Sequence, residues 1–353
     1  MRCTPGAPAA AGAVSKPFHP NSQMETTMRT KRLRKLLITA AFGSTLAAGL
    51  AFAATAHAQT YPGKAINYIL PFNAGGESDI SARFQQAVFK KVSGVETVIQ
   101  YMPGAGGAQA WSQLNSMPGD GYTIMGINLP HTVLQPMQKD VGYKTDELTP
   151  VNYFHYTPDA IFVHNDSQFK TLKDLVEFAK KSPGMVTFSG SGSNSSNQLA
   201  QVRFDELAGI KTTYIPFSGT GPAVTAILGK QTVAGFNYAP SGIAHVGKMR
   251  MLAVASEKRM PAFPDVPTFR ELGFDLVGGA YRGLSVPKST PEDIRQKVSD
   301  IISTINADPT FKKKMEDGGF VLTDVGYKEM PDFMAAKKKE YAALAGALGI
   351  KKQ

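Results

Sequence analysis

Apolar and polar positions follow a strand, turn and helix order that repeats along the chain. Residues 66–72 form an apolar run typical of a buried strand, and residues 78–92 carry apolar side chains at helical spacing. Further strands are expected at 95–102, 122–128, 161–164, 186–189, 213–217, 233–238 and 251–255. Further helices are expected at 172–181, 198–208, 291–305, 309–317 and 331–348, with one more ending near 229. This alternation predicts an α/β fold with parallel sheets and right-handed crossovers.

The pattern also predicts two domains. The chain has 353 residues, enough for two separate cores. We expect domain 1 to consist of residues 59–159 and 285–353, and domain 2 of residues 160–284. The proline- and glycine-rich stretch at 261–291 is expected to carry the chain back between them.

The turn PFNAGGESD at 71–79 joins the first strand to its helix. Gly75 and Gly76 permit a tight turn, and Ser78 and Asp79 suit the cap of the helix. A helix start leaves backbone N–H groups unpaired where the macrodipole is positive, so this turn is a candidate anion site. A tight turn without a ligand is the alternative reading.

A second turn of the same kind, TFSGSGSNSS, occupies 187–196. Ser195 and Ser196 suit both helix capping and ligand contact. In open parallel sheets ligands bind outside the carboxyl ends of strands, so two facing domains would bring both turns to one cleft. The turn PGAGGAQA at 103–110 is expected to be structural, because it lacks the third glycine and the acidic residue of a dinucleotide site.

The amino terminus has the pattern of a signal peptide. A basic stretch at 29–35 precedes an apolar stretch at 36–54, and Ala56-His57-Ala58 supplies a cleavage pattern. We expect cleavage after Ala58 and export to the periplasm; a membrane anchor is the alternative. The formal charge of +10 falls to +4 without the first 58 residues, which leaves 31 basic and 27 acidic residues. That balance gives no reason to expect a nucleic-acid partner.

The sequence contains few side chains suited to catalysis or metal binding. The single cysteine, Cys3, precedes the expected cleavage site, so disulfides, thiolate catalysis and cysteine-ligated metals are excluded from the mature chain. The histidines at 131, 155, 164 and 245 show no close metal-ligand spacing. We expect no metal, no cofactor and no enzymatic activity.

Several blocks of sequence resemble one family of receptors. These are YPGKAINYILPFNAGGESDISAR, PGAGGAQA, GDGYTIM, TFSGSGSNSSNQLA, YIPFSGTGPAVTAILGKQ and MLAVASEKRMPAFPDVPTFRELG. In this order they are similar to the periplasmic solute-binding receptors of tripartite tricarboxylate transporters, also called Bug proteins. The resemblance covers nearly all of the mature region.

The resemblance implies a two-domain periplasmic binding protein of type II, or Venus flytrap, each domain a mostly parallel sheet flanked by helices. Such a receptor captures a small organic carboxylate and delivers it to the membrane subunits of its transporter, and we expect it to act as a monomer. Backbone amides, hydroxyls and water would hold the carboxylate. Carried over by position, the expected site residues are Phe72, Asn73, Ala74, Gly75, Gly76, Glu77, Ser78, Asp79, Asn128, His131, Ser191, Gly192, Ser195, Ser196, Thr220, Asn237 and Arg282.

The chain departs from the family pattern at positions that bear on specificity. Gln198 replaces the usual histidine, Ser218 the usual lysine and Asn237 the usual aspartate. Glu77 lies inside the first turn, where a small residue is common. Its carboxylate would repel a second substrate carboxylate unless it is neutralised, and we hypothesise that Arg282 pairs with it. Monocarboxylates therefore remain open as ligands beside di- and tricarboxylates.

Two other functions remain open. A secreted serine hydrolase would need a G-x-S-x-G elbow or a serine, histidine and acid within reach. The sequence GSGSN at 190–194 breaks that pattern, and no histidine lies near it in the sequence. A co-receptor that reports its ligand to a membrane sensor would use the same cleft and differ only in its partner.

Overall fold

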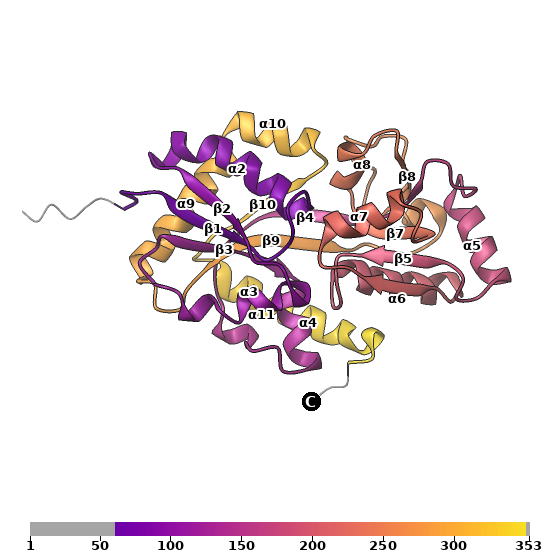
Figure 1. Ribbon diagram of the computed structural model, residues 1–353, viewed down its shortest axis with the longest axis horizontal. Helices are drawn as coiled ribbons and strands as arrows, with labels where there is room; N and C mark the ends of the chain where they lie inside the picture. Colours follow the sequence, from indigo (N-terminus) through magenta and orange to yellow (C-terminus); the bar gives the residue numbers. More distant parts are fainter. Residues whose placement is uncertain (1–60, 351–353) are drawn as a thin grey trace, which may run out of the picture. The chain divides into compact units, whose positions relative to one another are not determined.

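A computed structural model describes residues 61–350 (Figure 1). The expected signal peptide and its cleavage site lie outside the described residues. No helix within 61–350 is long and apolar enough to cross a membrane.

Ten strands form one sheet in the order β2-β1-β3-β9-β4-β7-β5-β6, and β8 and β10 each pair with β4. The strands are β1 (Ile66–Leu70), β2 (Thr97–Tyr101), β3 (Thr123–Leu129), β4 (Thr149–His164), β5 (Thr187–Gly190), β6 (Thr213–Pro216), β7 (Ala234–Tyr238), β8 (Met249–Val254), β9 (Gly279–Val286) and β10 (Val321–Val325). The neighbours β1–β2, β1–β3, β5–β6 and β5–β7 are parallel. Every pair that includes β4 or β9 is antiparallel.

Strand β4 has 16 residues and changes partners along its length. Up to Pro158 it pairs with β9 and β10, and from Asp159 onward it pairs with β7 and β8. We call β1, β2, β3, β9 and β10 with their helices the first lobe, and β5 to β8 with α5 to α8 the second lobe. Strand β4 is shared by both lobes. The expected domain limits remain a prediction.

Helices cover the sheet on both faces (Figure 1). They are α2 (Glu77–Ser93), α3 (Ala108–Trp111), α4 (His131–Gln138), α5 (Leu172–Lys181), α6 (Ser196–Ala208), α7 (Thr220–Leu228), α8 (Pro240–Ala244), α9 (Glu292–Ala307), α10 (Pro309–Asp317) and α11 (Met330–Leu344). Short 3-10 helices include η2 (Ala105–Gly107) and η6 (Ala345–Leu348).

The first lobe has two hydrophobic cores because successive residues of β1 point to opposite faces of the sheet. Tyr68 and Leu70 pack into the core that includes α2, α9 and α10. Ile69 packs into the core that includes Trp111 and residues of α4 and α11. Strand β3 is buried along its whole length, as expected of a strand covered on both faces.

The second lobe is organised around buried phenylalanines of β5, β7 and α6, namely Phe188, Phe236 and Phe204. Helix α5 packs on the same core. It begins with a capping box, in which Thr171 accepts a hydrogen bond from the N–H of Asp174 at 3.2 Å and the Asp174 side chain accepts one from the N–H of Thr171 at 2.8 Å.

The sequence predicted the α/β class correctly, but the sheet is mixed rather than mostly parallel. The difference comes from β4 and β9, which are antiparallel to all their neighbours; β9, β10 and the first part of β4 were not expected as strands. Strand β9 lies inside the stretch that was expected to be a connection. Its glycines made the segment look unlike a strand, because glycine is rare in strands. A Cβ at Gly283 would overlap the carbonyl oxygen of Asn152 on β4, so this glycine permits close approach of two backbones.

Candidate functional site

The first glycine turn is held by its own chain. Helix α2 begins at Glu77 with Gly76 as its N-cap, and no side chain caps it. The expected cap by Ser78 or Asp79 is therefore wrong. Instead Asp79 Oδ2 accepts a hydrogen bond from the Gly75 N–H at 2.8 Å, and Gly75 has a φ of 75°, a conformation that favours glycine. The start of α2 thus leaves backbone N–H groups available to an anion.

A second uncapped helix start lies against this turn. Helix α7 begins at Thr220 with Gly219 as its N-cap and without a side-chain cap. A Cβ at Gly219 would lie 3.4 Å from Phe72 Cβ, and a Cβ at Gly76 would lie 3.4 Å from the Gly221 nitrogen. The Asn73 side-chain amide donates a hydrogen bond to Ser218 Oγ at 2.9 Å. The positive ends of α2 and α7, from different lobes, therefore meet.

A small cavity lies at this meeting point, with a volume of about 10 Å³. That is about the space that one water molecule needs, so a larger solute requires the lobes to separate. Both lobes contribute to the lining, and every lining residue is one that the sequence singled out: Phe72, Gly76, Glu77, Ser78, Ser191, Thr220 and Arg282.

Glu77 and Arg282 pair on one side of the cavity, which confirms the hypothesised pairing. Arg282 Nε lies 2.6 Å from Glu77 Oε2, and the exposed fractions of the two residues are 4% and 2%. The Arg282 Nε–H donates to Ser78 Oγ at 3.2 Å, and Thr157 Oγ1 donates to Glu77 Oε1 at 2.7 Å. The Oε2 contact is an ion pair without hydrogen-bond alignment.

Two further groups surround the arginine. Its guanidinium carbon lies 4.6 Å from the centre of the Tyr238 ring. With the Asn128 amide oriented so that Oδ1 faces the arginine, that oxygen accepts from Nε at 2.6 Å and from Nη1 at 3.1 Å. Burial alone would lower the pKa of Arg282, but the Glu77 carboxylate and Tyr238 together raise it above its usual value. Arg282 is therefore a buried cation whose charge Glu77 balances.

Two buried histidines lie near this pair. His155 Nε2 is 3.6 Å from Glu77 Oε1. Burial, and then the charge of Arg282, hold the pKa of His155 well below its usual value. The same two causes lower the pKa of His131 to about 3. His131 packs edge-on against Phe72 and Trp111 and is fully buried, so it is not an exposed loop residue. Both rings are neutral near neutral pH and add no cation to the cavity.

The serines of the second turn have separate roles. Ser191 lines the cavity and its Oγ lies 3.1 Å from the Tyr238 hydroxyl. Ser195 caps α6 by accepting from the Gln198 N–H at 3.2 Å, and it also donates to the Gly192 carbonyl at 2.7 Å. Ser196 donates to Asp159 Oδ1 at 2.9 Å. The partners of these hydroxyls are backbone, tyrosine and carboxylate groups of the second lobe and β4, which is not the arrangement of a serine nucleophile.

The remaining expected site residues lie outside the cavity lining. Asp79 Oδ1 contacts the Tyr101 hydroxyl at 2.7 Å and Arg83 Nε at 2.9 Å. Asn237 is buried in β7, where its Oδ1 accepts from its neighbour's N–H. Gly192 and the carbonyl of Ala74 lie at contacts between the lobes. A direct role of these residues in ligand binding stays a prediction.

A larger side chamber of about 360 Å³ also lies between the same two lobes. Ser191 lines the cavity and the next residue, Gly192, lines the chamber. Its first-lobe wall is Ala105, Gly106, Gln135, Gln138, Lys139 and Val141. Its second-lobe wall is Gly192, Ser193, Asn194, Pro216, Phe217 and Ser218.

Sequence reasoning missed this chamber because the PGAGGAQA turn was expected to be structural. Ala105 has a φ of 48° and Asn194 a φ of 58°, so non-glycine residues in left-handed conformation face the chamber from both lobes. Strained backbone of this kind collects at functional sites. Asn194 Nδ2 donates to Gln138 Oε1 at 2.8 Å and joins the lobes across the chamber. The glycine turn after β2 was the available signal.

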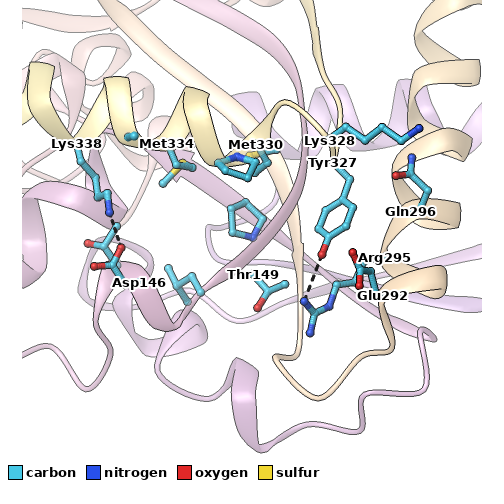
Figure 2. A pocket seen from close by; sticks show the side chains of 15 residues that line it. Asp146, Thr149, Glu292, Arg295, Gln296, Tyr327, Lys328, Met330, Met334 and Lys338 are labelled. Carbon is cyan, nitrogen blue, oxygen red and sulfur yellow. Dashed lines mark hydrogen bonds and ion pairs between the residues drawn. The ribbon is translucent and has the colours of Figure 1, made fainter.

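A larger hollow lies elsewhere in the first lobe, between the start of β4, α9 and α11 (Figure 2). Its volume is about 580 Å³. Its charged groups are largely engaged: Lys338 Nζ lies 2.7 Å from Asp146 Oδ1, and Arg295 donates to the Thr290 carbonyl at 2.7 Å. None of the expected site residues lines it. Size alone does not make it the site, and the interlobe cavity with its two helix starts is the better candidate.

Comparisons with known proteins agree with this geometry. The family described as "Tripartite tricarboxylate transporter family receptor" matches residues 81–350. The UPF0065 protein in the gbd 5' region of Cupriavidus necator is 29% identical over 88% of this chain and 95% of its own length. Within residues 61–350 no group of three or more His, Cys, Asp or Glu side chains could hold a metal ion.

Solved structures show the same fold. The periplasmic binding protein BugD superposes with a TM-score of 0.77 at 27% identity, covering 83% of this chain and 100% of that one. An R. palustris protein solved with adipate superposes with a TM-score of 0.77 at 22% identity, covering 82% and 99%. This chain has the α/β fold of the periplasmic binding proteins and belongs to the family of tripartite tricarboxylate transporter receptors.

Proposed function

We propose that this protein captures a small organic carboxylate between its two lobes in the periplasm and delivers it to the membrane subunits of a tripartite tricarboxylate-type transporter. The observation that carries the proposal is the meeting of two uncapped helix starts, α2 and α7, around a cavity lined by both lobes. Each start presents unpaired N–H groups and the positive end of a helix dipole. The hydroxyls of Ser78, Ser191 and Thr220 lie at the same cavity and add donors for carboxylate oxygens.

Binding involves opening and closing of the lobes. The cavity of about 10 Å³ is too small for an organic acid, so the solute enters when the lobes are apart. Closure forms contacts such as Asn73–Ser218 and Asn194–Gln138 across the interface. The two lobes serve as the two domains of the receptor.

The family supports the proposed location and partners of the receptor. Receptors of this family are not enzymes, so no chemical step is assigned to the site. BugD is a periplasmic binding protein, and the signal-peptide pattern that ends at Ala58 supports the same location here. The R. palustris relative is described with adipate, a carboxylate. We propose a monomer that meets the transporter when its lobes are closed on the ligand.

A thermal-unfolding screen against small organic acids tests the proposal. A ligand at one hundred times its dissociation constant stabilises the folded protein by about 2.7 kcal/mol. We expect at least one acid to raise the unfolding temperature without being consumed, and deletion of the gene to abolish uptake of that acid. A flat response to mono-, di- and tricarboxylates would contradict the proposal. Hydrolysis of an added ester would favour an enzyme instead.

A further inference from the structure

The charges at the cavity identify the class of acid that fits it. Of the residues that line the cavity, Glu77 and Arg282 are the two with formal charges. Arg282 Nε lies 2.6 Å from Glu77 Oε2, so the two opposite charges together contribute little net charge to the cavity. His131 and His155 are neutral near neutral pH. The positive field at the cavity therefore comes from the starts of α2 and α7, each equivalent to about half an elementary charge.

This field suits one carboxylate and opposes a second. Two half charges balance a single anion, and Arg282 has no spare charge because Glu77 already balances it. Glu77 is also the first residue of α2, so its carboxylate lies beside the N–H groups that would hold the ligand. A dianion with both charges near the cavity would find no positive charge left for its second carboxylate, because Glu77 already balances Arg282.

The side chamber would receive the rest of the solute. Ser191 of the cavity lining and Gly192 of the chamber lining are consecutive residues, and the chamber volume of about 360 Å³ exceeds that of the cavity. Its polar side chains are amides and hydroxyls: Gln135, Gln138, Ser193, Asn194 and Ser218. The one formal charge in its lining is Lys139, which is exposed. Gln135 and Asn194 are buried, whereas Gln138, Ser193, Ser218 and Lys139 are exposed, and an exposed lysine contributes little to binding.

We propose that the preferred solute is a monocarboxylate with an uncharged hydrogen-bonding group at its other end, and that Glu77 determines this preference. The carboxylate lies between the starts of α2 and α7, and the amide or hydroxyl end lies in the side chamber. This inference rests on the proposed receptor function. It adds the charge of the solute and the residue that selects it.

Calorimetric titration with matched six-carbon acids tests the inference. Adipate carries two carboxylates, its monoamide and 6-hydroxyhexanoate carry one and a polar end, and hexanoate carries one and an apolar end. We expect the monoamide to bind at least about tenfold more tightly than adipate and at least about threefold more tightly than hexanoate. Adipate that binds as tightly as its monoamide would overturn the inference while leaving the receptor function intact. If none of the acids binds and the broader screen is also flat, both proposals fail.

Variants of the charged residues make the test specific. Glu77→Gln keeps the size of the side chain and leaves Arg282 unbalanced, so we expect the ratio of adipate to monoamide affinity to rise at least about tenfold. Glu96→Gln removes the same charge from an exposed site paired with Lys90, and should leave the ratio within about twofold. An unchanged ratio in Glu77→Gln contradicts the role of Glu77.

A second variant keeps the test valid if Glu77→Gln does not fold. Lys139→Met removes the one charge of the chamber lining from an exposed position. If the chamber receives an uncharged end, the affinity ratio of adipate to its monoamide stays within about twofold of the unmodified protein. A fall of the ratio by about tenfold would show that Lys139 holds a second carboxylate, and would overturn the inference.

Discussion

The buried carboxyl of Asp159 gives this protein a pH-dependent stability that one substitution should remove. Asp159 is fully buried at the point where β4 exchanges its first-lobe partners for second-lobe partners. Its Oδ1 accepts hydrogen bonds from Ser196 Oγ at 2.9 Å and from Asn197 Nδ2 at 2.7 Å. Among the described residues its Oδ2 has no hydrogen-bond partner. Burial raises the pKa of Asp159 to about 7, although those two hydrogen bonds and Arg282 act to lower it.

The size of the effect follows from the two pKa values. An aspartate in an unfolded chain has a pKa of about 3.9, and the difference from about 7 corresponds to roughly 4 kcal/mol. Between these values the folded protein holds a proton that the unfolded chain has released. The stabilising contribution is therefore fully present below pH ~4 and is lost as the pH rises to ~7, after which it stays constant.

Asp159→Asn is the substitution that tests this reasoning. Asparagine keeps the two hydrogen bonds through its Oδ1 and cannot ionise. We expect the variant to gain up to about 4 kcal/mol over the unmodified protein near pH 8 and little near pH 4.5. Urea unfolding of both proteins at a series of pH values measures this difference. Other carboxyls cancel in the difference, including Asp174, Glu271 and Asp308, whose pKa values are lowered by hydrogen bonds.

The outcome that refutes the reasoning is a stability difference that does not change with pH. That result would mean that Asp159 ionises in the folded protein as easily as in the unfolded chain. Asp166→Asn is a suitable control, because Asp166 lies on the surface with 72% of its side chain exposed. Its difference from the unmodified protein should stay within about 0.5 kcal/mol at every pH.

Two further substitutions test the packing of the site and of the sheet. Arg282→Met leaves Glu77 buried without its cation and should lower the free energy of unfolding by about 3–5 kcal/mol. The double variant with Glu77→Leu should recover most of this loss. Failure to recover it would contradict the pairing. Gly283→Ala places a methyl group against the Asn152 carbonyl and should lower the unfolding free energy by about 1–3 kcal/mol. Gly346 has open space around it, so Gly346→Ala should change the unfolding free energy by less than about 1 kcal/mol. Equal effects of the two substitutions would show that β4 and β9 do not need the close approach.

Local patterns in the sequence predicted most helices and the core of the site. Helix α5 was predicted at 172–181 and α10 at 309–317, and both lie there. Caps and apolar periodicity specify such helices from within one segment of chain. The Glu77–Arg282 pair was predicted from charge alone, because a carboxylate in an anion-binding turn needs a neutralising partner.

The missed features depend on residues that are distant in the sequence. Strand β9 reads as a proline- and glycine-rich connection until β3 and β4 are placed on either side of it. The hydroxyls of Ser195 and Ser196 bond to Tyr214 and Asp159 of other strands, which their own segment does not reveal; their contact with a ligand stays a prediction. The turn at 105–107 becomes a chamber wall only when the second lobe faces it. Partners supplied by the fold decide these roles, and the sequence pattern of one segment does not contain them.

The partner exchange within β4 limits how the lobes can move. Pro158 is in register with Gly279 of β9, and the next residue, Asp159, is in register with Tyr238 of β7. Both lobes are therefore fixed to adjacent residues of one extended strand. Translation of one lobe past the other would break ladder hydrogen bonds on both sides, whereas a twist of the backbone between these two residues keeps them. A change of the backbone dihedral angles at Pro158 and Asp159, with a matching change at Gly278, whose carbonyl accepts from the Asp159 N–H at 3.0 Å, preserves the sheet while the starts of α2 and α7 move apart.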